Sequence, residues 1–230
     1  MFLPLHDHNR LKHVPRPYVN LSLIAANVLV FLVVQGGGIS EGASASVYSY
    51  GLVPAVFFDL RDLAPHLQVL PEWSGIVTYA FLHGDVMHLL GNMLFLWVFG
   101  DNVEDAVGHI GYLVFYLLCA AAGGFAYAAL DPGSEIPLIG ASGAVSGVVA
   151  AYLMLHPRVR IWVLAFGRVP LRLRAVWILG AWIIYQFVQI ATSIDSQVAW
   201  IAHIGGLAAG AVLILFMRRR GVVLFDRDLA

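Results

Sequence analysis

Charge is scarce in this sequence, and cysteine is almost absent. Of the 230 residues, 60% are apolar and only 12% are charged, whereas an average soluble domain has about 25% charged residues. The mean hydropathy is +0.81. These values exclude a water-soluble globule, and they exclude a disordered chain, which needs low hydrophobicity and high net charge. The formal net charge of −1 leaves no basic field for nucleic acid, so no nucleic-acid partner is expected.

The single cysteine, Cys119, lies inside an apolar run and cannot form an internal disulfide. What the sequence does contain is long apolar runs. A membrane-spanning helix needs about 20 mostly apolar residues to cross a core of roughly 30 Å. Six runs qualify: 18–35, 87–103, 110–130, 141–155, 176–192 and 198–217. We therefore predict an all-α polytopic membrane protein, with a short tail at 1–17, one six-helix membrane domain at 18–217 and a basic tail at 218–230.

Basic residues predict the orientation of this domain, because loops on the cytoplasmic side are enriched in Lys and Arg. With six spans, 12 of the 13 basic residues fall on one side: Arg10, Lys12, Arg16, Arg158, Arg160, Arg168, Arg172, Arg174, Arg218, Arg219, Arg220 and Arg227. Only Arg61 falls opposite. Both termini are therefore expected in the cytoplasm, and the loops at 36–86, 131–139 and 193–197 are expected to face outward. No signal peptide is evident, and because the chain is compact and shows no transit peptide or accessory domain, a prokaryotic inner membrane is the expected location.

The first loop, 36–86, is unusually long and rich in aromatic residues. Connectors of this length are uncommon unless they are functional. We expect an interfacial element partly sunk in the headgroups, with Trp73, Phe57 and Phe58 as anchors.

Four polar side chains lie where the bilayer makes them costly: His88 and Asn92 in the second run, Ser142 in the fourth and His203 in the sixth. Each has an ordinary explanation alone, since a membrane serine often bonds to its own turn and a lone histidine can satisfy a neighbour or line a proton path. Depth joins them. At 1.5 Å per residue, His88, Ser142 and His203 lie about 20, 24 and 22 Å above the expected cytoplasmic ends of their spans, which are near Asp101, Arg158 and Arg218. They therefore share one level.

Small residues predict that two of these spans touch. Gly143 and Gly147 lie four apart on the fourth run, Gly206 and Gly210 lie four apart on the sixth, and Gly140 is expected to take part in the same helix packing. Such spacing lets helix backbones approach closely in lipid. If these faces pack together, Ser142 and His203 come within reach of each other.

The chemistry that fits this level is nucleophilic. A serine hydroxyl needs a base within about 3 Å, and His203 is the only titratable candidate on the facing helix. The start of a helix offers free N–H groups, so the Ser142 amide is a natural oxyanion donor. His88 and Asn92 share one face at i and i+4. No Asp or Glu lies at this level, so a Ser–His dyad is expected in place of a triad.

Three segments carry a family resemblance: the run 81–92 with His88 and Asn92, Gly140-Ala-Ser142-Gly143, and 202–206 with His203. Together they resemble the motifs of the rhomboid family of intramembrane serine proteases, over residues 15–217. The segment 100–108 resembles a structural Glu/Gly segment of that family and assigns structural roles to Glu104 and Gly108.

The resemblance implies a six-helix core whose site opens outward, and cleavage of single-pass membrane proteins in or beside their spans. It assigns Ser142 as nucleophile, His203 as base, and Asn92, His88 and the Ser142 amide as the oxyanion hole. It implies no cofactor and no metal. Some members have an aromatic residue where this chain has Ser146, so the way in which His203 is oriented stays open. The Trp-Arg pair that some bacterial members have in the first loop is also absent.

Three alternatives are weaker. An inactive rhomboid-like protein that binds membrane helices would typically lack the Ser or the His. A transporter or proton channel using His88, His203 and Asn92 would be expected to show inverted repeats, and none is visible in the sequence. A metalloprotease using His83, Asp85 and His88 would need an HExxH motif, which is missing. The physiological substrate and the oligomeric state are not predicted.

Overall fold

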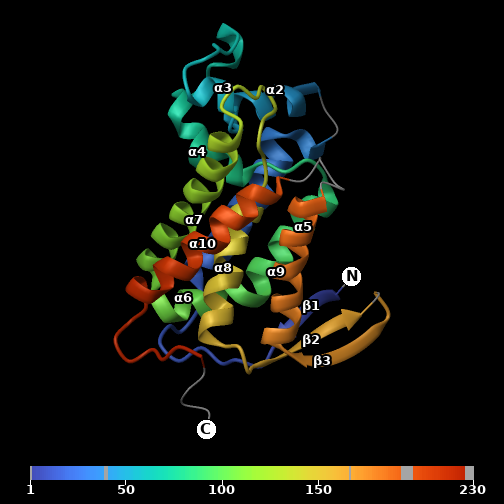
Figure 1. Cartoon of the computed structure of the whole chain (residues 1–230), viewed down its shortest axis with the longest axis vertical. Helices are drawn as coiled ribbons and strands as arrows, with labels where there is room; N and C mark the ends of the chain where they lie inside the picture. Colours follow the sequence, from blue (N-terminus) through green and yellow to red (C-terminus); the bar gives the residue numbers. More distant parts are fainter. Residues whose placement is uncertain (1, 39–40, 166, 193–198, 226–230) are drawn as a thin grey trace.

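The structure, a computed structural model, describes residues 2–38, 41–165, 167–192 and 199–225 (Figure 1). Helices occupy all six apolar runs. They are α1 (Tyr18–Leu29) continued by the π-turn η1 (Val30–Val34), α5 (Val86–Phe95) continued by the π-turn η6 (Leu96–Gly100) and by α6 (Asp101–Val107), α7 (His109–Leu130), α8 (Ser142–Leu155), α9 (Ala175–Thr192) and α10 (Trp200–Met217). Each predicted span thus coincides with a helix to within a few residues.

Four of these helical segments are long and apolar enough to cross a membrane: Val86–Val107, His109–Leu130, Ala175–Thr192 and Trp200–Met217. The other two, Tyr18–Val34 and Ser142–Leu155, are apolar but shorter. Helix α8 has 14 residues, which rise about 21 Å, less than a hydrocarbon core of about 30 Å. Its first residue, Ser142, can therefore lie below the membrane surface even when its last residue reaches the opposite face.

The centre of the molecule is the contact of α8 with α10 and α7 (Figure 1). Glycines bring the first two backbones together. A Cβ on Gly206 would lie 1.8 Å from the carbonyl oxygen of Gly143, and a Cβ on Gly210 would lie 2.2 Å from that of Gly147. No side chain fits at either of these two contacts. The glycines at these positions therefore determine how closely α8 and α10 approach each other.

A three-stranded antiparallel sheet lies at one end of the helices (Figure 1). Its strands are β1 (Phe2–Asp7), β2 (Arg160–Ala165) and β3 (Val169–Arg174), in the order β1-β2-β3. The all-α prediction is wrong for these residues, although the chain is mostly helical. In β2 the side chains alternate, with Ile161 and Val163 buried and Arg160 exposed, which is the period of a half-buried strand.

Strand β1 is anchored at its end by Asp7, which is buried. The carboxylate of Asp7 accepts hydrogen bonds from the Tyr152 hydroxyl of α8, at 2.6 Å, and from the Asn102 amide of α6, at 3.2 Å. The first residues of the chain are thereby attached to two membrane helices.

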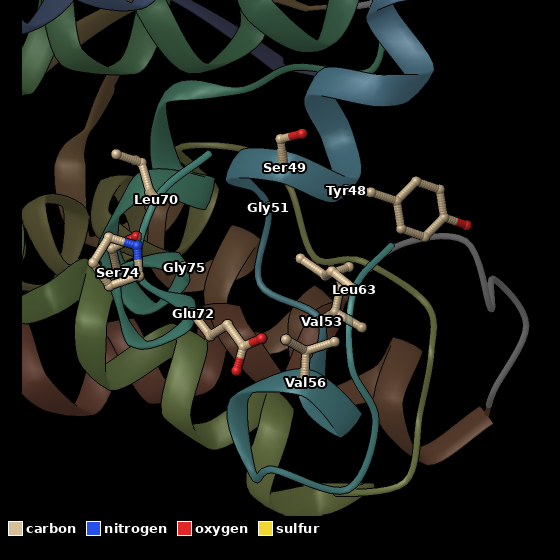
Figure 2. A pocket seen from close by; sticks show the side chains of 11 residues that line it. Tyr48, Ser49, Gly51, Val53, Val56, Leu63, Leu70, Glu72, Ser74 and Gly75 are labelled. Atoms are coloured by element: carbon tan, nitrogen blue, oxygen red, sulfur yellow. The ribbon is translucent and has the colours of Figure 1, made fainter. Parts of the chain in front are cut away.

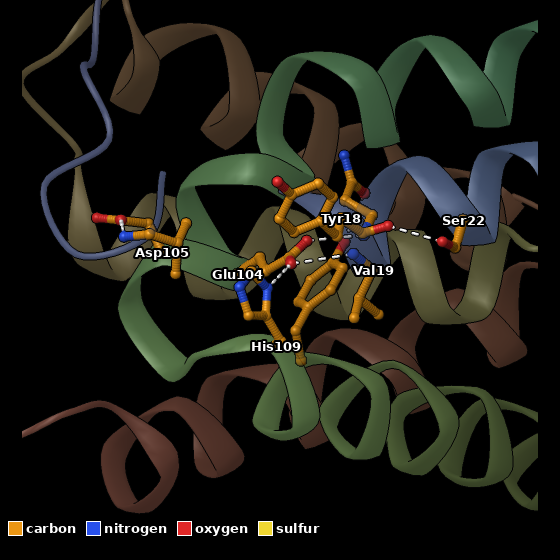
Figure 3. A network of polar contacts seen from close by, with 9 residues as sticks. Tyr18, Val19, Ser22, Glu104, Asp105 and His109 are labelled. Carbon is orange, nitrogen blue, oxygen red and sulfur yellow. Dashed lines mark hydrogen bonds and ion pairs between the residues drawn. The ribbon is translucent and has the colours of Figure 1, made fainter. Parts of the chain in front are cut away.

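Residues 8–17, here called the strap, connect β1 to α1 and are held by a carboxylate of α6, while a second carboxylate of α6 holds the start of α1 (Figure 3). Asp105 accepts the backbone N–H groups of Lys12, His13 and Val14 at 2.6–3.0 Å. The fully buried Glu104 accepts those of Val19 and Asn20, at 3.0 and 2.7 Å, and also contacts the ring of His109. Glu104 thus caps the start of α1, where free N–H groups and the helix dipole favour a negative charge.

Gly108 joins α6 to α7 with a φ of +81°, a left-handed conformation that favours glycine. A Cβ there would lie 2.7 Å from a guanidinium nitrogen of Arg219, and the backbone N–H of Arg219 donates to the carbonyl of Ala106 at 2.8 Å.

The strap, the β2–β3 hairpin and the tail after α10 lie at one end of the molecule (Figure 1). These segments carry the predicted basic side, except Arg227, which lies outside the described residues, as does the predicted loop 193–197.

The first loop occupies the opposite end and folds as short helices, among them α2 (Glu41–Tyr50), α3 (Pro54–Phe57) and α4 (Gly75–Thr78). Short 3-10 turns complete it: η2 (Gly36–Gly38), η3 (Pro65–Leu67), η4 (Glu72–Ser74) and η5 (Tyr79–Phe81). Trp73 is 70% exposed, while Phe57 and Phe58 are partly buried against the core. Figure 2 shows a small pocket within this loop, with Tyr48, Leu63 and Glu72 among its lining residues.

Candidate active site

Ser142 is the first residue of α8, at the point where an extended segment enters the helical bundle. The first loop holds this segment through backbone hydrogen bonds. Leu52 and Leu138 exchange two of them, at 3.1 and 2.8 Å, and Gly140 donates its N–H to the carbonyl of Tyr79 at 3.0 Å. The long first loop therefore fixes the position of the serine, and the N–H groups of the first helical turn have no partner within α8.

His203 lies in the first turn of α10 and is only 7% exposed. Its Nε2 lies 2.8 Å from the Oγ of Ser142. The glycine contacts between α8 and α10 bring these two side chains together. A hydroxyl at this distance from an imidazole nitrogen can pass its proton to the ring as the oxygen attacks an electrophile.

The other ring nitrogen of His203, Nδ1, lies 2.9 Å from the Oε1 of Gln186, on α9. Trp200 packs its ring edgewise against the imidazole, with 5.5 Å between ring centroids. The sequence analysis did not single out Gln186. The available signal was a pair of amide side chains, Gln186 and Gln189, three residues apart in an otherwise apolar span, and both are buried.

Ser146 occupies the position one turn after the serine. Its hydroxyl donates to the carbonyl oxygen of Ser142 at 2.6 Å, within the same helix. The ring nitrogens of His203 contact Gln186 and Ser142, whereas Ser146 bonds to its own turn.

His88 and Asn92 lie on one face of α5. The helix begins where the Asp85 carboxylate accepts the backbone N–H of His88, at 2.9 Å. A Cβ on Gly140, whose φ is +114°, would lie 2.7 Å from the His88 ring and 3.7 Å from the Ser142 hydroxyl. His88 and Ser142 therefore flank Gly140. The Asn92 side chain is 7% exposed, and its amide donates to the carbonyl of His88 at 3.0 Å.

His83, just before α5, is completely buried and stacks edgewise on His88, with 5.1 Å between ring centroids. Gln35 exchanges two hydrogen bonds with the backbone of His83, at 2.8 and 2.9 Å. Burial, with a smaller contribution from His88, lowers the pKa of His83 to about 3, so the ring is neutral near pH 7.

Within the ranges that the structure describes, no three His, Cys, Asp or Glu side chains are grouped as a metal site would require. The loop pocket of Figure 2 is not lined by Ser142, His203, His88 or Asn92. A larger cavity of about 300 Å³ lies beside β1 and is lined by Asp7, Asn20, Trp97 and Asp101, among others.

The model of one protein family, the Rhomboid domain, matches residues 70–220, about two thirds of the chain. The chain belongs to the rhomboid family. Because four of its helical segments are long and apolar enough to cross a membrane, this rhomboid is an integral membrane protein. The glycine contacts and the Ser142–His203 pair all lie within the matched residues.

Several curated rhomboid proteins are similar to it. The rhomboid protease GluP of Bacillus subtilis (strain 168) is 33% identical over 138 residues, which are 60% of this chain and 24% of that protein. RHOMBOID-like protein 12, mitochondrial, of Arabidopsis thaliana is 31% identical over 153 residues, 60% of this chain and 44% of that protein. The rhomboid protease GlpG of Enterobacter sp. (strain 638) is 25% identical over 197 residues, 84% and 60% of the two chains. The match covers between 24% and 60% of the length of these three relatives, so this rhomboid spans only part of each of them.

Proposed function

We propose that this rhomboid is an intramembrane serine endopeptidase that uses a Ser142–His203 dyad. The observation that carries the proposal is the 2.8 Å separation of the Ser142 Oγ and the His203 Nε2. The relatives named rhomboid proteases support it. Both dyad residues are present, which disfavours an inactive helix-binding protein.

In the proposed reaction, the Oγ of Ser142 attacks the carbonyl carbon of a peptide bond while its proton moves to the Nε2 of His203. The tetrahedral intermediate collapses, its C–N bond breaks, and the imidazolium returns the proton to the leaving amine. Water then attacks the acyl-serine ester, with His203 acting as base, and the carboxylic acid product leaves with Ser142 restored.

The oxyanion that forms on the substrate carbonyl needs preorganised donors. We assign this role to the Ser142 backbone N–H, at the start of α8, and to the His88 ring and the Asn92 amide of α5. Gly140 allows the His88 ring to approach this place, because a Cβ there would clash with it.

The proposed substrates are single-pass membrane proteins, cleaved within or beside their spans. Small residues at the cut site and helix-breaking residues in the substrate span are favoured, because an unwound backbone can reach Ser142 only where its polar groups find partners. We further propose six spans, with both termini in the cytoplasm of a prokaryotic cell and the site open to the periplasmic side. Basic residues gathered at one end of the molecule support this orientation.

The test is proteolysis in liposomes, with a reporter whose membrane segment is rich in Gly and Ala. Ser142→Ala and His203→Ala are expected to abolish cleavage, and chelators are expected to leave it unchanged. Ser146→Ala is the matched control, since Ser146 lies one turn further along α8 and its hydroxyl donates to the carbonyl oxygen of Ser142 in the same helix; it should retain cleavage. Undiminished cleavage by Ser142→Ala would refute the dyad.

A further inference from the structure

Gln186 gives the candidate base a hydrogen-bond partner on a third helix. Ser142 lies on α8, His203 on α10 and Gln186 on α9, and the two contacts of the imidazole measure 2.8 and 2.9 Å. The Gln186 side chain is 1% exposed. Neighbouring side chains of α9, among them Tyr185 and Phe187, are more than half exposed. Gln186 is thus a polar side chain turned inward from a helix whose other face is apolar.

The contact selects one form of the His203 ring. A neutral imidazole has one nitrogen that donates and one that accepts. The Oε1 of Gln186 is a carbonyl oxygen and only accepts, so its 2.9 Å contact requires the proton on Nδ1. Nε2 is then the acceptor that faces the Ser142 hydroxyl. This is the tautomer that a general base needs, and the opposite tautomer would point an N–H at the serine.

We propose that Gln186 is a positioning residue for the reaction: its Oε1 holds the Nδ1–H of His203 and so fixes the tautomer and the plane of the base. This inference rests on the proposed function of the dyad. Gln186 does not touch the reacting atoms and acts only through His203. It supplies the orientation that Ser146, turned to its own helix, does not.

An amide suits this place better than a carboxylate. An ionised carboxylate buried in a membrane span carries a desolvation penalty that one hydrogen bond to a neutral imidazole does not offset. A neutral amide accepts the same hydrogen bond at far lower cost. It gives less stabilisation to the imidazolium, so removing it should cost less than the roughly 10⁴-fold loss known for a triad carboxylate.

The experiment compares Gln186→Leu with Gln189→Leu in liposomes. Gln189 is the matched control, because it lies one turn further along α9, is 7% exposed, and donates to the Tyr185 hydroxyl. Gln186→Leu should lower kcat about 10–100-fold, by analogy with the loss seen when the orienting partner of a metal-bound histidine is removed, with KM within about twofold. Gln186→Glu, which keeps an acceptor oxygen, should recover part of the loss. Gln189→Leu should stay within twofold of the unaltered chain.

A second measurement reports the ring itself. The ¹⁵N signals of His203 should show a protonated Nδ1 in the unaltered chain and a mixture of tautomers in Gln186→Leu. If Gln186→Leu does not fold, Gln186→Asn provides the same test, since its shorter side chain withdraws the acceptor while staying polar. Unchanged kcat in a folded variant, an equal loss in Gln189→Leu, or an unprotonated Nδ1 would overturn the inference. Activity that survives Ser142→Ala would instead refute the proposed function.

Discussion

Asn92 illustrates how a single buried amide can matter in a membrane helix. Its Nδ2 donates to the carbonyl of His88, one turn earlier on α5. This bond uses one of its two N–H donors and leaves the other for a substrate oxyanion.

We expect Asn92→Ala to lower kcat by about 10²–10³-fold with little change in KM, the usual effect of removing one oxyanion donor. Reporter cleavage at saturating substrate measures this. Asn27→Ala is the control, because Asn27 makes the same bond to its own helix, at 2.8 Å to Leu23, on α1. Turnover unchanged in Asn92→Ala would remove Asn92 from the oxyanion hole.

The buried ring of His83 leads to a separate prediction about how stability depends on pH. Its folded pKa, about 3, lies below the ordinary value of 6.5 because the charged ring is desolvated. The contribution of the neutral ring to stability is therefore complete above pH 6.5 and is lost progressively as pH falls toward 3.

The thermal midpoint in detergent should thus fall more steeply between pH 7 and pH 4.5 in the unaltered chain than in His83→Leu. The test compares the slope of the thermal midpoint against pH in the two proteins. Asp85 and His88 lie near His83 but are present in both proteins, so they do not account for a difference between the slopes. Parallel pH profiles would contradict the prediction.

At the residue scale, the sequence predicts the dyad because Ser142 and His203 are costly in a bilayer and lie at one depth. It does not predict Gln186, since an amide is a less unusual side chain than an imidazole. Whether Gln186 faces lipid or His203 also depends on the rotation of α9 about its axis. That rotation is set by packing against α10 and α8, which spacing alone does not specify.

At the scale of elements, the attachment of the strap depends on one carboxylate. Asp105 is 7% exposed and accepts three consecutive backbone N–H groups. Hydrogen bonds to a charged group contribute about 1.5–3 kcal/mol each when buried.

We expect Asp105→Ala to release residues 12–14, so that their amides exchange with deuterium at least tenfold faster. Asp105→Asn keeps one acceptor oxygen and should give an intermediate rate. Amides inside α7, where the helix supplies its own acceptors, provide the internal reference. Unchanged exchange at residues 12–14 in Asp105→Ala would show that the carboxylate does not hold the strap.

The sheet shows what the sequence does not predict at this scale. The residues of β2 alternate as a strand should, but Arg160 and the arginines of β3 mark the hairpin equally well as a basic loop. Strand β1 finds its partner far along the chain, with Phe2 opposite Ala165. Pairing across such a distance has no local signal, whereas the spans are predicted well because their length and apolarity are local properties.

For the whole molecule, the crossing of α8 and α10 controls both packing and chemistry, since each helix carries one member of the dyad. Gly206→Ala would place a Cβ 1.8 Å from the carbonyl oxygen of Gly143, which is rigid helical backbone. We expect a loss of about 1–3 kcal/mol in stability, typical of overpacking, and a loss of cleavage as Ser142 and His203 separate.

Gly91→Ala is the matched control for that prediction. Gly91 lies within α5, and a Cβ there meets no atom within 4 Å. An alanine should stabilise the helix by about 0.5–1 kcal/mol and leave cleavage unchanged. Thermal unfolding and reporter cleavage, measured on both variants, distinguish a clash at the crossing from a general effect of removing glycine. Equal behaviour of the two variants would contradict the role of the crossing.

The pairing of β1 with β2 has a consequence for the order in which the protein is made. Strand β1 leaves the ribosome before its partner, and about 160 residues must follow before β2 is available. At about 5–20 residues per second, this delay is roughly 8–30 s. During that time the strap can already bind Asp105 of α6, while β1 has no neighbouring strand. In a nascent chain arrested before β2, the residues of β1 should therefore be sensitive to protease. They should become resistant only after α8 and the β2–β3 hairpin have been synthesised.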